Sequence, residues 1–481
     1  MTHHLKTKIK IVGTLGPSSS DPKMIEAMLK QGLTVVRINM SHGDQTIHAE
    51  MIAKARAAAK KTGCPVAILQ DLSGPKIRIG DFQTEEITLE PGNKFVLTTK
   101  PLVGTVEKVH VNYETLPKEV KAGMYIYLND GKQRLLVEKI TKTEIHTIIE
   151  VGGTIKPRRG VNVPDANLSI SSLTPKDKKD LKWGLTQDVD FVTLSFVRTA
   201  SDIRDLRKLI PKDRKVAIVA KIETKFAIDN LDEIIDAADV IMVARGDLAI
   251  EMPLEKVPLL QKRIIRTANK MGKPVITATQ MLDSMRIASV PTRAEVADIA
   301  NAILDGTDAI MLSDETTIGN HPDRAIEVMA QVALEVENDP LFVQHQTDWN
   351  FTADTVYTGV SRSVARNVLS SNAQAIVALS ESGNTGRSVA RYRPQVPIIV
   401  LTPSLETFNH MLVVYGCEPV LIKSVKSLPE AQKAAQKALH DRGLAKPGDT
   451  YILTAGIPFG AAGATNMMIV EKMPLPLYNR Y

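Results

Sequence analysis

The stretch VAIVAKIETKFAIDNLDEIIDAADVIMVARGD, residues 216–247, decides the fold of this chain. It begins with a short apolar run at 216–222, continues with a helical pattern, and closes with a second apolar run at 240–244. Continuous apolar runs separated by helical periodicity are typical of buried parallel strands joined by crossover helices. The stretch therefore predicts one βα unit followed by the strand of the next.

Six more apolar runs have the same character, which brings the number of predicted parallel strands to eight. The eight runs are 9–12, 34–40, 66–72, 191–197, 216–222, 240–244, 274–279 and 309–312. Eight such units predict a TIM (β/α)8 barrel, an α/β fold whose active site forms at the carboxyl ends of the strands. An open doubly wound sheet is the alternative, but the G-x-G-x-x-G motif typical of that fold is absent.

Two further segments have patterns of their own. After the third run, 76–171 contains short alternating runs and an Asn-Asp-Gly hairpin signal at 129–131, which predict an inserted small all-β domain, a β-barrel lid. Apolar runs alternate with helices again over 347–481, which predicts a C-terminal α/β domain with a mostly parallel sheet. The barrel domain is then discontinuous, 1–75 and 172–346. The lid strands are expected at 86–89, 94–97, 108–111, 125–128, 134–137 and 144–150.

Composition excludes several classes of protein. The 481 residues are 43% hydrophobic and 24% charged, which is typical of globular domains and not of disordered chains. Cys64 and Cys417 are the two cysteines, too few for a disulfide framework, so a cytoplasmic protein is expected. No apolar run predicts a membrane span or a secretory signal. The net charge of +6, without a basic stripe, favours phosphorylated small molecules over nucleic acid.

Polar side chains follow the predicted barrel strands at the end where such a barrel collects its catalytic groups. The residues at these strand ends are, in strand order, Arg37, Asn39, Ser41 and His42; Asp71; Ser195; Lys221 and Glu223; Ala244, Arg245, Gly246 and Asp247; Thr279; Ser313 and Glu315. One polar residue at a strand end is usually solvated. So many at one barrel mouth predict an active site.

Two carboxylates on neighbouring strands, Glu223 and Asp247, offer hard oxygen ligands that suit Mg²⁺. The alternative is that both carboxylates are engaged in salt bridges with basic side chains. Lys221 lies two residues before Glu223, so both side chains point to the same face of the strand. An ammonium group there suits the stabilisation of negative charge that develops on an oxygen. Gly246 allows backbone N–H groups to approach an anion closely.

Seven motifs in this order resemble pyruvate kinase. They are KIKIVGTLGP at 8–17, RINMSHG at 37–43, DLSGPKIR at 71–78, IVAKIE at 218–223, MVARGDL at 242–248, ATQML at 278–282 and PTRAE at 291–295. The resemblance spans the whole chain, including the insert and the C-terminal domain. It implies transfer of the phosphoryl group of phosphoenolpyruvate to ADP, giving pyruvate and ATP in the last step of glycolysis.

The resemblance also implies roles for the groups at the barrel mouth. Glu223 and Asp247 would hold Mg²⁺, for which Mn²⁺ would substitute. Lys221 and Arg37 would stabilise the charge of the transferring phosphoryl group and of the enolate oxygen. The implied substrate-binding set is Arg37, Ser195, Lys221, Ala244, Arg245, Gly246, Asp247 and Thr279.

Proton transfer and nucleotide binding complete the implied chemistry. Thr279 would contact the substrate carboxylate, with Ser313 and Glu315 in a water relay behind it, and the proton donor to the enolate stays open. The implied nucleotide-binding set is Thr14, Asn39, His42, Arg78 and, from the lid, Arg159.

The C-terminal domain contains a second candidate site, an anion cradle for the phosphate of an allosteric effector. The run Ser-Glu-Ser-Gly-Asn-Thr at 380–385 follows an apolar strand and opens a helix, and a Gly-rich loop at 460–465 would lie nearby. An ordinary helix cap is the alternative. The expected effector set is Ser380, Glu381, Ser382, Gly383, Asn384, Thr385, Gly463 and Thr465. Glu381 argues against a highly anionic sugar bisphosphate, and the family resemblance implies a homotetramer.

One motif departs from the pattern of many pyruvate kinases, in which a K⁺ ion lies near the substrate phosphate. The matching oxygens here belong to Asn39, Ser41, Asp71 and the backbone at Leu72, but Lys76 replaces a glutamate and Leu72 a threonine. A lysine ammonium is a fixed monovalent cation. The sequence therefore predicts a requirement for Mg²⁺ without one for K⁺, whereas a solvated lysine at the lid hinge is the alternative.

Two other functions compete with this assignment. A metal-dependent oxo-acid lyase or aldolase would also carry Lys, Glu and Asp at a barrel mouth, but would not be expected to combine the insert with the C-terminal domain. A non-catalytic effector-binding protein is disfavoured because Lys221, Glu223, Asp247 and Thr279 are all present. No nucleic-acid or membrane partner is expected.

Overall fold

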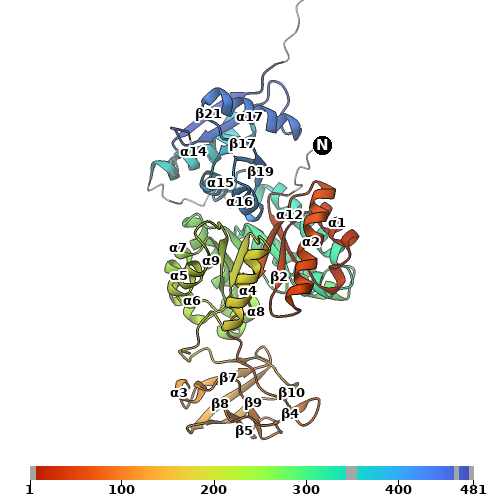
Figure 1. The fold of residues 1–481 in the computed structure, drawn as a ribbon, viewed down its shortest axis with the longest axis vertical. Helices are drawn as coiled ribbons and strands as arrows, with labels where there is room; N and C mark the ends of the chain where they lie inside the picture. The colour runs from red at the N-terminus through yellow and green to blue at the C-terminus, as the bar shows by residue number, and fades with distance from the viewer. Residues whose placement is uncertain (1–6, 343–350, 352–354, 460–464, 476–481) are drawn as a thin grey trace, which may run out of the picture.

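A closed barrel of eight parallel strands forms the centre of the molecule (Figure 1). The computed structural model describes residues 7–342, 351, 355–459 and 465–475. The barrel order is β1-β16-β15-β14-β13-β12-β3-β2, which confirms the TIM barrel and excludes the open sheet. The strands are β1 (Lys10–Thr14), β2 (Leu33–Asn39), β3 (Ala67–Asp71), β12 (Phe191–Leu194), β13 (Ala217–Ile222), β14 (Val240–Ala244), β15 (Val275–Ala278) and β16 (Ala309–Leu312).

Each barrel strand is apolar on both faces because one face fills the barrel and the other meets the helices. On β13, Ala217 and Val219 belong to the core cluster inside the barrel. Ile218 and Ala220 belong instead to the cluster shared with the surrounding helices. This two-sided burial explains why the strands appear in the sequence as continuous apolar runs without alternation.

Helices cover the barrel and begin at capping residues supplied by the sequence. At the start of α4 (Pro175–Thr186), Thr174 and Asp177 form a reciprocal capping box. The other helices are α1 (Pro22–Gln31), α2 (Gln45–Thr62), α5 (Ala200–Leu209), α6 (Lys225–Asp229), α7 (Leu231–Ala237), α8 (Arg245–Glu251), α9 (Val257–Lys270), α10 (Arg293–Leu304), α11 (Asp314–Thr317) and α12 (Pro322–Asn338), with 3-10 turns η1 (Pro17–Ser19), η2 (Leu254–Lys256) and η3 (Asp283–Arg286). Among the residues that the structure describes, none of the helices combines the length and apolarity needed to cross a membrane.

The insert between β3 and α4 lies beyond one end of the barrel (Figure 1). Its strands are β4 (Ile87–Leu89), β5 (Lys94–Thr98), β6 (Lys108–His110), β7 (Tyr125–Leu128), β8 (Gln133–Ile140), β9 (Glu144–Val151), β10 (Gly153–Ile155) and β11 (Val161–Asn162). The Asn-Asp-Gly turn joins β7 to β8, with Asn129 at φ 52° and Asp130 at φ 57°. The predicted hairpin is therefore confirmed.

The insert differs from the expectation in two respects. Its main sheet has the order β11-β7-β8-β9-β5-β6 and is mostly antiparallel, so it is a half-barrel with two edges rather than a closed barrel. The strands β10 and β4 form a separate two-stranded sheet, and α3 (Leu116–Glu119) adds one helical turn. Strands β10 and β11 were not expected, because runs of three and two residues carry no periodicity signal.

The C-terminal domain lies at the opposite end of the barrel from the insert (Figure 1). Its five-stranded sheet has the order β19-β18-β17-β20-β21, and only the pairing of β20 with β21 is antiparallel, which confirms the mostly parallel sheet. The elements are α14 (Val356–Ser371), β17 (Ala373–Leu379), α15 (Asn384–Ala390), β18 (Ile398–Thr402), α16 (Leu405–His410), η4 (Met411–Val413), β19 (Cys417–Leu421), α17 (Leu428–Asp441), β20 (Thr450–Ala455) and β21 (Met467–Lys472).

A buried ion pair joins the C-terminal domain to the barrel. Arg393, 1% exposed, donates from Nη1 and Nη2 to the two carboxylate oxygens of Asp308 at 2.9 and 2.8 Å. Nη2 also donates to Asn269 Oδ1 and to the carbonyl oxygen of Gly306, and the guanidinium lies 4.8 Å from the ring centroid of Tyr415. These contacts fix the orientation of the two domains.

Candidate active site

An arginine and an aspartate at the carboxyl ends of β2 and β3 form the first part of the barrel mouth. Arg37 Nε donates to Asp71 Oδ2 at 2.8 Å, and its Nη1 donates to Thr14 Oγ1 at 2.9 Å. All three side chains are buried. A guanidinium held on two sides is oriented before any substrate binds, which lowers the entropic cost of recognising an anion.

Lys221 occupies the centre of the mouth, on β13. Its Nζ donates to Ser195 Oγ at 2.9 Å and lies 3.2 Å from Glu223 Oε2 and 4.0 Å from Asp71 Oδ1. Burial alone would lower the pKa of Lys221, but the carboxylates of Asp71, Glu223 and Asp247 outweigh it and raise the pKa. The lysine is therefore a permanent cation.

The carboxylates around Lys221 leave oxygen atoms that suit a further cation. Glu223 accepts the Phe196 N–H at 2.9 Å through Oε1, while its buried Oε2 has no hydrogen-bond donor. Asp71 Oδ1 is also buried without a hydrogen-bond donor, and both oxygens face the ammonium of Lys221 as ion-pair partners. Burial, with Asp247 nearby, raises the pKa of Glu223 to about 7. Three carboxylates against two cations, Arg37 and Lys221, leave net negative charge.

This donor set fits a hard divalent ion. Glu223 and Asp247, which lies in the first turn of α8, supply carboxylate oxygens of the kind that Mg²⁺ prefers. Within the described part of the chain no group of three or more His, Cys, Asp or Glu residues could hold a metal alone. Mg²⁺ takes few protein carboxylates and completes its shell with water and substrate oxygens.

A left-handed turn after β15 presents Thr279 to the start of α8. Thr279 and the next residue, Gln280, have φ values of 80° and 55°, a region that costs free energy for residues other than glycine. A Cβ atom at Gly246 would lie 2.8 Å from Thr279 Cγ2, so only glycine allows this approach. The backbone at the start of α8 and the threonine side chain therefore lie side by side.

Arg245 stabilises this turn and was not expected to do so. Its guanidinium donates to the carbonyl oxygens of Ala278 at 3.1 Å and Thr279 at 2.8 Å, and pairs with Asp298 at 2.6 Å. The side chain is thus engaged by protein groups, which leaves the backbone around Gly246 as the part that faces the mouth. The preceding residue, Ala244, is the buried end of β14.

Glu315 connects the loops that follow β15 and β16. Its Oε1 accepts the Leu282 N–H at 3.0 Å and its Oε2 accepts the Ser313 N–H at 2.9 Å. Burial raises the pKa of this carboxyl group, and the backbone donors oppose that shift. Glu315 therefore joins the loop after β15 to the loop after β16, a structural task that sequence spacing did not indicate.

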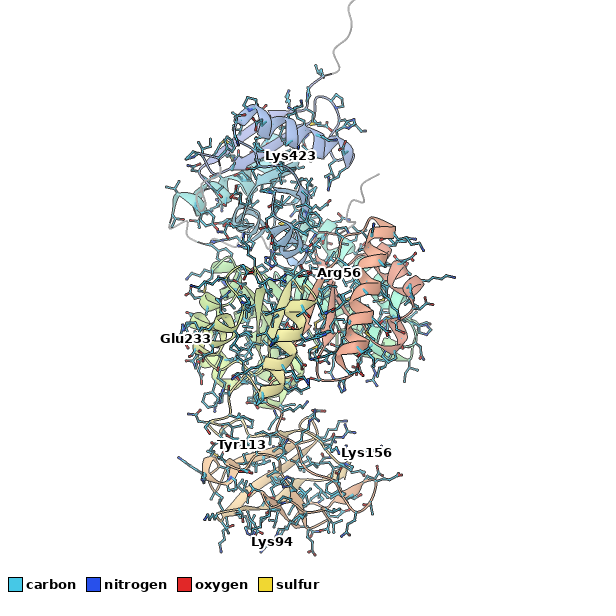
Figure 2. The ribbon with its side chains drawn as sticks, in the orientation of Figure 1. Arg56, Lys94, Tyr113, Lys156, Glu233 and Lys423 are labelled. Carbon is cyan, nitrogen blue, oxygen red and sulfur yellow. The ribbon has the colours of Figure 1, made fainter. Side chains whose placement is uncertain are left out.

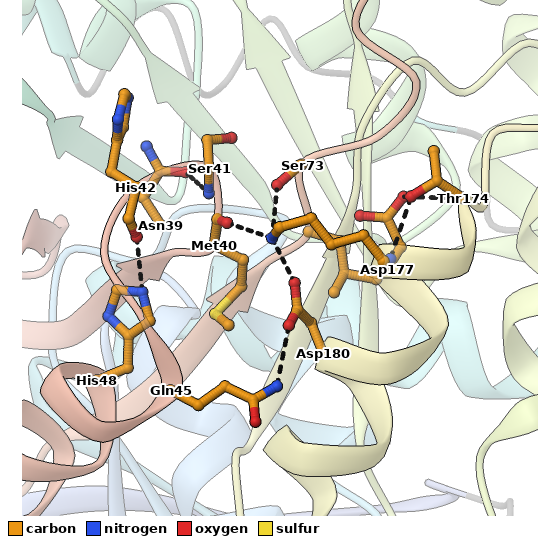
Figure 3. A network of polar contacts seen from close by, with 12 residues as sticks. Asn39, Met40, Ser41, His42, Gln45, His48, Ser73, Thr174, Asp177 and Asp180 are labelled. Atoms are coloured by element: carbon orange, nitrogen blue, oxygen red, sulfur yellow. Dashed lines mark hydrogen bonds and ion pairs between the residues drawn. The ribbon is translucent and has the colours of Figure 1, made fainter.

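A lysine that the sequence analysis did not single out supports the loop after β2 (Figure 3). Lys176 Nζ donates to the Met40 carbonyl and to Asp180 Oδ2, both at 2.6 Å, and to Ser73 Oγ at 3.4 Å. The fixed loop contains Asn39, whose Oδ1 accepts the Ser41 N–H, and the exposed His42, whose carbonyl oxygen bonds His48 Nε2. The sequence signal that could have identified Lys176 is its i,i+4 spacing from Asp180 at the capping box of α4.

Lys76 lies at the junction of the barrel and the insert. Its side chain is exposed and lines, with Asp247, a small cavity of about 70 Å³ between the two domains. A Cβ atom at Gly160 would lie 3.3 Å from Lys76 Cε, so the lysine packs along the insert. Leu72 is buried, and its carbonyl oxygen accepts the Ser195 hydroxyl at 2.8 Å.

Neighbouring arginines of the insert differ in the contacts of their side chains. Arg158 pairs with Asp81 at 2.8 Å, and its carbonyl oxygen accepts Arg78 Nη1 at 3.0 Å. Arg159 is exposed, and its carbonyl oxygen accepts the Ile79 N–H. The side chain of Arg159 is exposed, whereas Asp81 holds that of its neighbour.

The expected anion cradle borders a cavity of about 350 Å³ in the C-terminal domain. Ser380 Oγ accepts the Thr385 N–H at 3.3 Å, and the hydroxyls of Thr385 and Thr465 lie 2.8 Å apart. The turn needs glycine, because Gly383 has φ 80°. The cavity is lined, among others, by Ser380, Glu381, Ser382, Asn384, Thr385, Glu406 and Thr465. Gly463 lies outside the described residues.

Comparisons with known proteins match both the barrel and the C-terminal domain. The family described as "Pyruvate kinase, barrel domain" matches residues 6–326, and "Pyruvate kinase, alpha/beta domain" matches 359–471. Pyruvate kinase 2 of Synechocystis sp. is 40% identical over 475 residues, 98% of this chain and 80% of that protein. The pyruvate kinase of Staphylococcus saprophyticus is 42% identical over 466 residues, covering 96% and 80%. A crystal structure of a pyruvate kinase from Cryptosporidium parvum superposes with a TM-score of 0.92 at 31% identity, covering 98% and 97%.

Proposed function

The chain belongs to the pyruvate kinase family, and from this premise we propose how its residues perform the reaction. The enzyme transfers the phosphoryl group of phosphoenolpyruvate to ADP and gives pyruvate and ATP. The assignment of the site rests on one observation, the buried contact of Lys221 with Ser195 and Glu223 at the barrel mouth. The oxo-acid lyase or aldolase and the non-catalytic protein have no support.

Charge stabilisation is the main task of the residues at the mouth. Lys221 and Arg37 lie ready to neutralise the transferring phosphoryl group and the enolate oxygen, and both are fixed by protein partners. Phosphoryl transfer depends mostly on such positioned charge. Glu223 and Asp247 would hold Mg²⁺, or Mn²⁺ in its place, which supplies positive charge to phosphate and carboxylate oxygens when bound.

Substrate orientation comes from the turn after β15. The Thr279 hydroxyl and the backbone N–H groups at Gly246 and Asp247 form a surface for the substrate carboxylate. Arg245 acts on this surface as a positioning residue, because it holds the carbonyl oxygen of Thr279. Ser313 and Glu315 would orient the water relay behind Thr279. The nucleotide would bind Thr14, Asn39, His42 and Arg78, with Arg159 approaching from the insert.

The direct test is a coupled assay with phosphoenolpyruvate and ADP in the presence of Mg²⁺. Pyruvate formation that depends on ADP is the expected result. Pyruvate formation without a nucleotide, or none at all, would contradict the assignment. The same assay on cell fractions tests the further proposal that the enzyme acts in the cytoplasm, where glycolysis takes place.

Independence from K⁺ is the second element of the proposal. Lys76 borders the cavity that Asp247 also lines, so its ammonium can supply monovalent charge beside the substrate phosphate. Lys176 places another ammonium 2.6 Å from the carbonyl oxygen of Met40, in the loop whose oxygens would otherwise meet K⁺. Leu72 has an apolar side chain and offers no side-chain oxygen.

We expect the wild-type rate in a tetramethylammonium salt to be unchanged when K⁺ is added at constant ionic strength. Lys76→Glu should create a K⁺ stimulation of more than about tenfold, because it replaces the fixed cation with a carboxylate that needs one. Steady-state rates measure both effects. Lys156→Glu, an exposed change elsewhere in the insert, is the matched control. A large K⁺ stimulation of the wild type would contradict the proposal.

Allosteric regulation by a phosphorylated metabolite is the third element. The cradle cavity is large enough for a sugar monophosphate and is lined by hydroxyl groups and by Lys215. Glu381 and Glu406 also line it, so a highly anionic bisphosphate is disfavoured. An ordinary helix cap would account for the Ser380 hydrogen bond but not for a cavity beside it.

Ser382→Asp should abolish activation by sugar monophosphates and leave the basal rate unchanged, because a new carboxylate in the cradle repels a phosphate group. The measurement is an effector titration of the rate at low phosphoenolpyruvate concentration. Ser382→Ala, which adds no charge, should retain most of the activation. Superimposable activation curves for the wild type and the aspartate variant would exclude the cradle as the effector site.

A homotetramer is proposed as the assembly through which such regulation would pass. Large apolar side chains are exposed on the barrel near α8 and α9, where Leu254 and Leu259 are 71% and 69% exposed. Ile287 and Val290 are exposed in the same way. Second copies of the chain would cover such a surface. Light scattering should give the mass of four chains, and the mass of one chain would contradict the proposal.

The chain is divided accordingly into a barrel domain, 1–75 and 172–346, a lid, 76–171, and an effector domain, 347–481. The division is supported by the elements, since β3 ends at Asp71 and α4 begins at Pro175. Limited proteolysis that cleaves near these limits, and not within the barrel, would test it.

A further inference from the structure

One short helix carries both a candidate metal ligand and a contact to the insert. Asp247 and Glu251 lie four residues apart on α8, so their side chains share one side of the helix. Both line the cavity of about 70 Å³ between the barrel and the insert. Glu251 Oε1 accepts a hydrogen bond from Asn162 Nδ2 at 3.2 Å, and α8 lies at the end of the barrel that faces the insert (Figure 1). This hydrogen bond is called the hinge contact below, and the reaction described above assigns no task to its two residues.

The barrel side of the hinge contact is held firmly. Arg245, the first residue of α8, pairs with Asp298 at 2.6 Å and donates to the carbonyl oxygen of Thr279 at 2.8 Å. Glu251 is the last residue of the same helix and is half-buried. Burial raises the pKa of Glu251 to about 7, and the hydrogen bond from Asn162 opposes that shift. The helix is therefore a fixed anchor, and the amide of the insert stabilises its carboxylate.

The insert side of the hinge contact is continuous with two arginines of the proposed nucleotide set. Asn162 ends β11, which pairs with β7 in the main sheet of the insert. Just before it, 159–161 is joined to 77–79 by backbone hydrogen bonds of 2.9 and 3.0 Å and by a β-bridge. These two segments carry Arg78 and Arg159. A rotation of Asn162 relative to the barrel therefore moves both arginines together.

Two other contacts join the barrel to the insert, and neither fixes the sheet in the same way. Arg198 donates to carbonyl groups within 168–170, which belong to the connection that returns to α4. Lys225 pairs with Asp165 at 2.8 Å, with 44% and 50% of the two side chains exposed. Water screens such an exposed pair, so it contributes little. The hinge contact is half-buried and reaches the sheet itself.

We propose that Glu251 is a positioning residue for the nucleotide: through the hinge contact it sets the orientation of the insert and so places Arg78 and Arg159 at bound ADP. The inference rests on the nucleotide-binding set of the proposed function. Phosphoenolpyruvate would bind residues of the barrel alone, so loss of the hinge contact should weaken the use of ADP and spare that substrate. Positioned charge loses its effect when it is displaced by about 1 Å.

The kinetic test varies each substrate in turn. Glu251→Ala and Asn162→Ala should each raise the KM for ADP by more than about fivefold and change the KM for phosphoenolpyruvate by less than about twofold. The double variant should match the single ones, because each removes the same contact. Glu251→Gln keeps an oxygen that accepts from Asn162 and should restore most of the affinity for ADP. An unchanged KM for ADP in both single variants, or effects that multiply in the double variant, would overturn the inference.

The orientation of the insert can be measured without any substrate. Spin labels at Lys94→Cys in the insert and Glu233→Cys on the barrel report it as a distance, and both positions are exposed and labelled in Figure 2. Lys94 lies at the end of the insert away from the barrel. The native cysteines, Cys64 and Cys417, are buried, so the labels attach to the new sites.

The distance distribution from electron spin resonance should be wider in Glu251→Ala than in the wild type. Lys225→Met is the matched control, and it should give the wild-type distribution because its ion pair is exposed. Equal widths for Glu251→Ala and the wild type, or an equal broadening in the control, would overturn the role of Glu251. A wider distribution with an unchanged KM for ADP would instead remove Arg78 and Arg159 from the nucleotide set, and with them the link to ADP.

Discussion

Lys221→Met should lower kcat by about 10³-fold while changing the KM for phosphoenolpyruvate little. The ammonium group lies among Ser195, Glu223 and Asp71 at the barrel mouth. In the proposed mechanism its charge would act there on an oxygen that becomes more negative as the reaction proceeds. An interaction that strengthens in the transition state affects turnover more than binding. Methionine has a similar length and no charge, so it tests the charge alone.

The measurement is a steady-state analysis with both substrates, together with a thermal unfolding curve that reports whether the variant is folded. Lys225→Met is the matched control. It removes an exposed ammonium, paired with Asp165 of the insert, four residues along the chain. Turnover of the control should stay within about threefold of the wild type. A loss of less than about tenfold in Lys221→Met would contradict the role of Lys221.

Arg393→Ala should destabilise the union of barrel and C-terminal domain by about 3–5 kcal/mol, the usual cost of removing one partner from a buried ion pair. Asp308 would remain buried without the guanidinium, and the N–H groups of Val275 and Tyr415 would compensate its charge only in part. Asn269 Oδ1 would lose the hydrogen bond that it now accepts from Arg393 Nη2. The expected result is a first urea transition at lower concentration than in the wild type.

An exposed ion pair provides the comparison for this effect. Arg324 lies 2.6 Å from Glu327 on α12, with 42% and 31% of the two side chains exposed. Arg324→Ala should change the free energy of unfolding by less than about 1 kcal/mol, because water screens such pairs. Equal effects of the two substitutions would mean that the Arg393 pair does not hold the domains together.

The fold and the meeting of the strand-end residues at one barrel mouth were predictable because their signals are local. Each barrel strand is buried on both faces, so it appears as an apolar run, and the Asn-Asp-Gly turn at 129–131 specifies its hairpin by the conformations its residues favour. Residues at the ends of such strands converge by geometry alone, which is why the sequence is enough to group Lys221, Glu223 and Asp247.

Contacts between distant segments left no such signal. Arg393 and Asp308 are 85 residues apart in the sequence, and an arginine in a loop looks like any exposed charge until the partner domain covers it. Lys176 and Met40 are 136 residues apart. The turn at Thr279 is another case, because a left-handed threonine is imposed by Arg245 and the packing around it rather than by its own preference.

The two domains added to the barrel are not equally separable from it. The insert leaves after Asp71, returns before Pro175, and has its own core cluster, which includes Phe95, Leu128 and Ile149. The insert is therefore a self-contained domain, and a short linker or an unrelated domain could replace it without opening the barrel.

The C-terminal domain has no such independence, because its core continues into the interior of the barrel. Val12 and Leu69 of the barrel belong to one cluster with Ile398 and Leu412 of that domain. Removing the C-terminal domain would expose this end of the barrel interior to water, together with the carboxylate of Asp308. Recombination between relatives would therefore tolerate exchange of the insert alone, whereas the barrel and the C-terminal domain must be inherited together.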